Sequence, residues 1–207
     1  MEIGQEYLEE YHFYYYPWPI KNNDVQTLDM HTISCGFFDG SFANPFDDFV
    51  MGYEWAREVH AEIWFDDMRI TSCGLLEYSV ICFPKREGDL SPDRWHSIRI
   101  PVTDPGKALK FLEDSSESRA QYKIPMMDFV LPNQAVDYLE KDDDCDDPMS
   151  WKHLFCSKFA LLFLRHCHRK GIIAAPEEKL KLLWSVNSNR CSPALLKQIL
   201  VKIFDRK

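Results

Sequence analysis

The sequence has few glycines and no segment that resembles a phosphate-binding loop. Its eight glycines are spread thinly over 207 residues, whereas the loops that cradle phosphates need clustered glycines. No apolar run approaches the roughly 18 residues that a membrane-spanning helix requires. The Lys and Arg residues are scattered and the formal net charge is −9, although nucleic-acid and anionic-membrane binders need clustered cations. We therefore expect no nucleic-acid partner and no transmembrane segment.

The cysteines do not form a disulfide pattern. Seven are present, an odd number, spread widely and without a CxxC pair, unlike the cysteines of disulfide-rich secreted domains. The first residues, MEIGQEYLEE, lack the basic, apolar and small-residue order of a signal peptide. These features predict a reduced, intracellular, cytoplasmic protein.

The composition is that of one globular domain with an N-terminal extension. Hydrophobic residues make up 45% and aromatic residues 14% of the chain, which is enough apolar surface to form a buried core. Residues 1–30 begin acidic and continue with an aromatic stretch, which Pro17 and Pro19 restrict to an edge strand or an extended arm. Within this extension, residues 7–20 either cover a groove of the domain itself, which we favour, or bind a protein partner. The domain proper is expected to span residues 31–207.

Hydrophobic periodicity predicts strands in the first half of the domain and helices on both sides of them. We expect strands at 31–38, 59–65, 69–72, 78–83 and 96–101, and helices at 46–56, 107–117, 150–170 and 193–204. The segments 59–65 and 69–72 form a predicted hairpin. Because the connections are too short for repeated βαβ units, the pattern indicates an α+β fold with an antiparallel sheet.

Cys156 is the candidate nucleophile because it lies near the start of the strongest predicted helix. The free N–H groups at a helix N-terminus favour the thiolate, and they can stabilise an oxyanion during acyl transfer. Such a thiolate needs a base. His60 opens a predicted strand, and Glu62 points to the same face two residues later. Judged on these residues alone, a buried Cys that only packs is the commoner outcome.

An ordered set of short motifs strengthens the pairing of Cys156 with His60. Its main segments are Asn44-Pro45, Trp55, His60–Phe65, Thr71-Ser72, Arg94-Trp95, Gln121-Tyr122, Asp128–Pro132, Trp151, Phe155–Ser157 and Ser192-Pro193. The set resembles the circularly permuted branch of the NlpC-type cysteine peptidase superfamily, which occurs in large DNA viruses, phages and bacteria. In that branch, as here, the His precedes the Cys.

The resemblance implies a papain-like core, in which a Cys-bearing helix packs on an antiparallel sheet that carries the His. It also implies that Cys156 is the nucleophile and His60 the general base. The third residue of such sites orients the imidazole from the next strand, and that position is at or beside Ser72. A Ser orients a His more weakly than a carboxylate does. Glu62 is therefore a substitute, and Glu77 is a weaker one.

Two lysines depart from the pattern of the family. Lys158 stands where many relatives have Glu after the Cys-Ser, and Lys123 stands where they have Asp after the Tyr. Both departures bear on the class of substrate more than on the thiol chemistry.

No metal or cofactor is predicted. The His and Cys residues of the last third of the chain lack zinc-ligand spacing. The acidic run Glu140–Asp147 lacks the regular spacing and the glycine of an EF-hand loop. We expect this run to be an exposed, solvated loop.

Three functions remain open at this point. The first is a cysteine hydrolase, such as a peptidase or amidase, acting on a peptide or amide substrate. The second is a lipid or protein acyltransferase or thioesterase on the same core, as in the related lecithin–retinol acyltransferase branch. The third is a catalytically weak interaction module that uses the aromatic arm. The lack of a membrane anchor favours the hydrolase, and the resemblance makes a virus-encoded protein acting in a host cell one expected setting.

Overall fold

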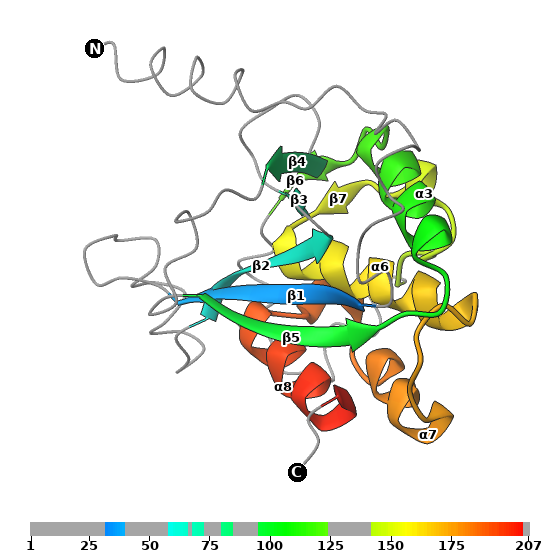
Figure 1. The fold of residues 1–207 in the computed structure, drawn as a ribbon. Helices are drawn as coiled ribbons and strands as arrows, with labels where there is room; N and C mark the ends of the chain where they lie inside the picture. Colours follow the sequence, from blue (N-terminus) through cyan, green and yellow to red (C-terminus); the bar gives the residue numbers. More distant parts are fainter. Residues whose placement is uncertain are drawn as a thin grey trace.

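Antiparallel strands and the helices packed on them form an α+β fold (Figure 1). The computed structural model describes residues 32–39, 58–65, 68–72, 80–84, 95–123 and 142–204. Within these ranges the predicted α+β class and the antiparallel sheet are confirmed. The N-terminal extension with the arm at 7–20, the predicted helix 46–56 and Glu77 lie outside the described residues.

Among the described residues, the main sheet has five strands in the order β4-β3-β2-β1-β5. The strands are β1 (Thr32–Asp39), β2 (Glu58–Phe65), β3 (Met68–Ser72), β4 (Val80–Pro84) and β5 (Trp95–Pro101). The predicted hairpin is confirmed as β2 and β3, with Ile63 opposite Ile70. On its other side β2 pairs with β1, where Phe38 lies opposite His60. The strand that carries His60 is therefore held by hydrogen bonds along both edges.

Two of the helices begin at the signals that the sequence provides. α3 (Pro105–Ser116) starts after Asp104, whose carboxylate accepts a hydrogen bond from the Lys107 amide at 3.0 Å. α8 (Pro193–Phe204) starts after Ser192, whose hydroxyl accepts one from the Leu195 amide at 3.2 Å. Both caps satisfy amides that have no acceptor within the helix. The predicted helices 107–117 and 193–204 are thus confirmed.

The helix α6 (Cys156–Arg169) forms the centre of the core. It packs on β2 and β3 of the sheet, and it also contacts α3, α8 and the short 3-10 helices η3 (Lys181–Trp184) and η4 (Ser188–Arg190). Every residue from Cys156 to Cys167 is buried. Figure 1 shows α6 behind β1 and β2, with α8 below it and α7 (Glu177–Leu180) near its far end. None of the helices in the described ranges has the length and apolar character needed to span a membrane.

α6 is shorter than the predicted helix 150–170. The segment before it contains the 3-10 helix η2 (Pro148–Ser150) and the strand β7 (His153–Leu154), which pairs in parallel with β6 (Gln121–Tyr122). The carbonyls of Lys152 and Leu154 accept hydrogen bonds from that neighbouring strand, each at 2.9 Å. Since these carbonyls are used there, the helix begins only after them. Its predicted end is confirmed, because Gly171 follows with φ 66°, which favours glycine.

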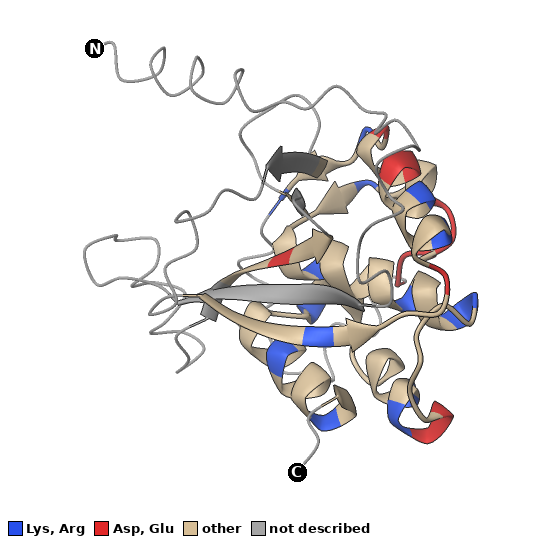
Figure 2. Cartoon of the chain, in the orientation of Figure 1, with Lys and Arg blue, Asp and Glu red and all other residues tan. Residues whose placement is uncertain are grey.

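The acidic strap, which we define as Asp142–Asp147, packs along α6. Figure 2 shows this red segment beside Lys and Arg positions of α6. Asp142 binds Arg165 at 2.7 Å, Asp143 binds Lys158, and Asp146 binds Arg169 at 2.9 Å. The expectation of a solvated loop was wrong for these three carboxylates, which are half-buried, because the cations of α6 draw them onto the helix.

Candidate active site

Cys156 is the first residue of α6. Phe155 before it is extended, with φ −144° and ψ 168°, and contributes no side-chain cap. The first helical hydrogen bond runs from the Phe159 amide to the Phe155 carbonyl at 2.9 Å. The amides of the first helical turn therefore have no acceptor within the helix. They place partial positive charge beside the sulfur of Cys156, which favours its thiolate form.

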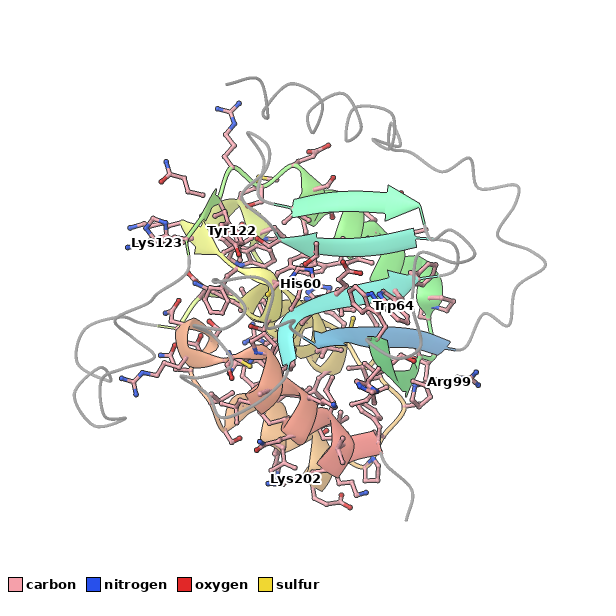
Figure 3. All side chains as sticks on the ribbon, turned by 90° about the vertical axis from the view of Figure 1, so that its left-hand side faces the viewer. His60, Trp64, Arg99, Tyr122, Lys123 and Lys202 are labelled. Carbon is pink, nitrogen blue, oxygen red and sulfur yellow. The ribbon has the colours of Figure 1, made fainter. Side chains whose placement is uncertain are left out.

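β2 presents His60, Glu62 and Trp64 on one face, because alternate residues of a strand point to the same side. Figure 3 shows His60 and Trp64 along this strand. The side chain of His60 is 27% exposed, while that of Glu62 is 3% exposed. The imidazole therefore retains contact with solvent, whereas the carboxylate behind it does not.

Cys156 and His60 interact by charge and by a side-chain hydrogen bond, and each shifts the pKa of the other toward its ionised form. Burial lowers the pKa of His60, but the Cys156 thiolate and then the Glu62 carboxylate raise it to about 10. Burial raises the pKa of Cys156, but the charge and hydrogen bond of His60, with the amides of Ala61 and Ser157, bring it below its usual value. Each charge stabilises the other in a site where neither would persist alone.

Glu62 holds the imidazole from the other side. Its Oε1 lies 3.2 Å from His60 Nε2, and its Oε2 accepts a hydrogen bond from Trp64 Nε1 at 3.1 Å. Both carboxylate oxygens therefore have a donor, which a buried carboxylate needs to stay ionised. The sequence indicated Glu62 as a substitute third residue, and the structure brings it to His60.

Thr71 on β3 also contacts the imidazole. Its hydroxyl donates to the Ala61 carbonyl at 2.9 Å and lies 3.4 Å from His60 Nε2. Because its hydrogen is used at Ala61, the oxygen can only accept at His60. Nε2 thus faces two acceptors, Thr71 and Glu62, and carries a hydrogen. The other ring nitrogen, Nδ1, is the one left for Cys156.

Ser72 does not reach the site. It is fully buried, and its Oγ has no hydrogen-bond partner among the described residues. Since Ile63 lies opposite Ile70, Glu62 and Thr71 are next along the two strands and share a face, while Ser72 points to the opposite face. The predicted position at or beside Ser72 therefore corresponds to Thr71.

Two tryptophans from the motif segments His60–Phe65 and Arg94-Trp95 complete the wall of the site. The ring of Trp95 lies edge-on to His60, with centroids 6.4 Å apart, and 5.5 Å from the ring of Trp64. The sequence predicted a core or cleft-wall position for Trp95 but gave no role to the ring of Trp64. The strand alternation that paired His60 with Glu62 extends to Trp64, and it could have drawn attention to that residue.

The side chain of Lys158 is buried and binds other residues of the fold. It is 2% exposed, pairs with Asp143 of the acidic strap and donates a hydrogen bond to Asn189 Oδ1 at 2.5 Å. Its charge is therefore neutralised within the fold, although it lies only two residues after Cys156. This departure from the family pattern adds no free charge to the site.

One group of described residues has donor atoms close enough for a metal ion. These atoms belong to Asp144, Cys145 and Asp146, and they lie within 4.8 Å of one another. The two carboxylates already bind Arg169, at 3.1 and 2.9 Å. Burial raises the pKa of Cys145 to about 11, so its thiol stays protonated and is a poor ligand. The group is better explained as part of the acidic strap.

Comparison of the chain with protein-family models, with curated proteins and with solved structures found no match.

Proposed function

We propose that the protein is a cysteine hydrolase with a papain-like core of the circularly permuted NlpC type. The observation that carries the proposal is the pairing of the buried Cys156 with the partly exposed His60, which lowers the pKa of the thiol. Two further features support it. The helix that begins with Cys156 packs on the strand that carries His60, and the Glu62 carboxylate orients the ring from behind. Nucleophile, base and orienting group are thus in contact, as nucleophilic catalysis requires.

The first half of the reaction transfers the acyl group to sulfur. The Cys156 thiolate attacks the carbonyl carbon of an amide, so that a C–S bond forms and the carbonyl oxygen becomes an oxyanion. The unpaired amides at the start of α6 are suited to stabilise that charge. His60 then gives the proton of its Nδ1 to the leaving nitrogen. The C–N bond breaks, the amine departs and a thioester remains.

The second half releases the acid and restores the pair. The neutral imidazole of His60 takes a proton from water, whose oxygen attacks the thioester carbonyl. The C–S bond breaks, the carboxylic acid leaves, and Cys156 returns to the thiolate beside a protonated His60. Glu62 stays ionised throughout, because Trp64 and His60 satisfy its two oxygens.

The test is the reactivity of Cys156 toward iodoacetamide at pH 6, followed site by site by mass spectrometry. The wild-type chain is compared with Cys156→Ala and His60→Ala. We expect Cys156 to react faster than a model thiol, and we expect the His60 substitution to remove that advantage. Equal rates for Cys156 and a model thiol, with no effect of His60→Ala, would rule the proposal out.

A further inference from the structure

The paired strands β6 and β7 bring a second segment of the chain beside the nucleophile. Gln121 lies opposite His153, and Tyr122 lies opposite Leu154. The next amide, that of Lys123, donates to the Leu154 carbonyl at 2.9 Å. Lys123 is therefore held next to the residues that lead directly into Cys156. Figure 3 shows Tyr122 and Lys123 together, on the side of His60 away from Arg99.

These two segments carry positive charge only. The stretches 118–123 and 151–158 contain no Asp or Glu, although the chain has a net charge of −9. Arg119, Lys123 and Lys152 are exposed, and within the described part of the chain none of the three forms an ion pair or a side-chain hydrogen bond. We call these three residues the cationic edge.

Several other cations of the described residues are neutralised by nearby carboxylates. Lys107 and Lys110 on α3 pair with Asp104 and Asp114, at 2.8 and 3.2 Å. The buried Lys158 pairs with Asp143. Unpaired cations such as Arg99 and Lys202 lie on β5 and α8, away from His60 (Figure 3). The cationic edge differs from them because it adjoins the nucleophile.

We propose that the substrate carries an anionic group, a carboxylate or a phosphate, next to the scissile carbonyl and on the side of β6 and β7. This inference rests on the proposed function, and it assigns Lys123 as the main residue that determines specificity. An anionic group would gain the attraction of the cationic edge, and the described stretches 118–123 and 151–158 contain no carboxylate to oppose it. A cationic group at the same place would be repelled.

Lys123 lies close enough to Cys156 for its charge to act on a substrate bound there. Neighbouring strands lie about 4.8 Å apart, and Cys156 follows Leu154 by two residues of about 3.5 Å each. The ammonium of Lys123 can therefore act over a distance on the order of 10 Å, which is about one Debye length at 0.1 M salt. At this distance in water, one unit charge changes the local concentration of a monovalent anion about twofold.

The test compares two alkylating probes that share a leaving group and differ in charge. Iodoacetate and iodoacetamide both require the thiolate, so the ratio of their rate constants at Cys156 cancels any change in thiol pKa. At low salt we expect this ratio to fall about twofold in Lys123→Gln and about fourfold in Lys123→Glu. Lys152→Glu should lower the ratio in the same direction, which gives a second, independent variant.

Lys202→Gln is the matched control, because Lys202 is an exposed lysine of α8 away from His60 (Figure 3). Its ratio should equal that of the wild type, and 1 M salt should remove most of the effect of the Lys123 substitutions. An unchanged ratio in Lys123→Glu and Lys152→Glu, with Cys156 still reactive, would overturn the inference. A wild-type Cys156 that reacts no faster than a model thiol would instead overturn the proposed function.

Discussion

Cys156 and Cys167 lie on the same helix and are both buried, at 7% and 0% exposure. The pKa values of their thiols nevertheless shift in opposite directions. Burial raises the pKa of Cys167 far above its usual value, and the nearby Cys145 raises it further. Burial acts on Cys156 as well, but there the His60 imidazolium outweighs it and the pKa falls. The partner supplied by β2 therefore decides which of the two thiols has a lowered pKa.

The two ends of α6 also use buried charge differently. At the first turn, the charged pair joins Cys156 to His60, whose side chain is 27% exposed. Farther along the helix, Arg165 is 1% exposed and binds Asp142 and the carbonyls of Leu183 and Val186. The pair at the first turn has a proton that can move between His60 and Cys156. Arg165 instead joins α6 to the segments that carry Asp142, Leu183 and Val186. Four substitutions separate these roles.

The largest expected effect is on stability, from Arg165→Met. The substitution keeps much of the side-chain volume but leaves Asp142 Oδ2 and the carbonyls of Leu183 and Val186 without their arginine donor. We expect a loss of about 3 kcal/mol in the free energy of unfolding, measured by urea denaturation. Arg169→Met is the control, because Arg169 pairs with Asp144 and Asp146 at 44% side-chain exposure, and it should cost less than about 1 kcal/mol. Similar losses in both variants would show that burial of Arg165 has no special role.

The next largest effect is expected from His60→Gln. In the wild type, the thiolate persists above the lowered pKa of Cys156, and the imidazolium persists up to the His60 pKa of about 10. Alkylation of Cys156 should therefore remain fast as the pH falls toward 6. Without the imidazolium, burial raises the thiol pKa, and the rate at pH 6 should drop about 100-fold. Cys167 serves as the internal reference, since its slow labelling should be the same in both proteins.

Glu62→Gln should have a smaller effect. The amide still fills the space and can accept from Trp64, but it removes the charge that helps to raise the pKa of His60. The imidazolium should lose its proton at lower pH than in the wild type, as followed by NMR titration of His60. Labelling of Cys156 at pH 6 should fall about tenfold.

Glu177→Gln is the matched control for this substitution. Glu177 forms a carboxylate–imidazole pair with His168 at 3.0 Å, but the carboxylate side chain is 68% exposed. Its loss should leave Cys156 labelling unchanged. If Glu62→Gln behaved like Glu177→Gln, Glu62 would have no orienting role at His60.

The smallest effect is expected from Trp64→Phe, which keeps a ring beside Trp95 and removes the indole N–H. Glu62 Oε2 then loses its donor, which should slow Cys156 labelling about three- to fivefold. The matched control is Trp184→Phe, because Trp184 Nε1 donates to His168 at 2.9 Å on the surface. A rate that changes equally in both variants would count against a positioning role for Trp64.

Much of the fold follows from local signals. Strand alternation, the Asp104-Pro105 and Ser192-Pro193 helix starts and the glycine after α6 each depend on neighbouring residues only, and each is found as expected. The start of α6 was predicted too early. Its true start depends on hydrogen bonds from residues 121–123, which are more than 30 residues distant in the sequence.

The site was predictable to the extent that it lies on one strand. His60 and Glu62 were expected on one face because strand alternation requires it. The sequence placed the third residue of the site on the next strand, at or beside Ser72. Thr71 and Ser72 are neighbours on that strand and point to opposite faces of the sheet, so a difference of one residue in the strand register decides which of them meets His60. The Trp64 donor was missed because an aromatic residue in a strand carries no mark that separates packing from hydrogen bonding.

The partners of the acidic strap could not be predicted from the sequence. Its charge is visible in the sequence, but its partners lie on α6, about 20 residues away, and no periodicity connects them. Ion pairs of this kind form only after the helix and the strap are brought together.

By itself, therefore, the sequence determined the α+β class, the Cys156 position close to a helix start and the shared face of His60 and Glu62, because each follows from short-range geometry. Only the tertiary structure decided that His60 meets Cys156, that Thr71 and not Ser72 joins them, and that Lys158 is neutralised while Lys123 has no ion-pair partner among the described residues. These outcomes depend on distances between segments that are remote in the chain, and the shift of the two thiol pKa values depends on the same distances.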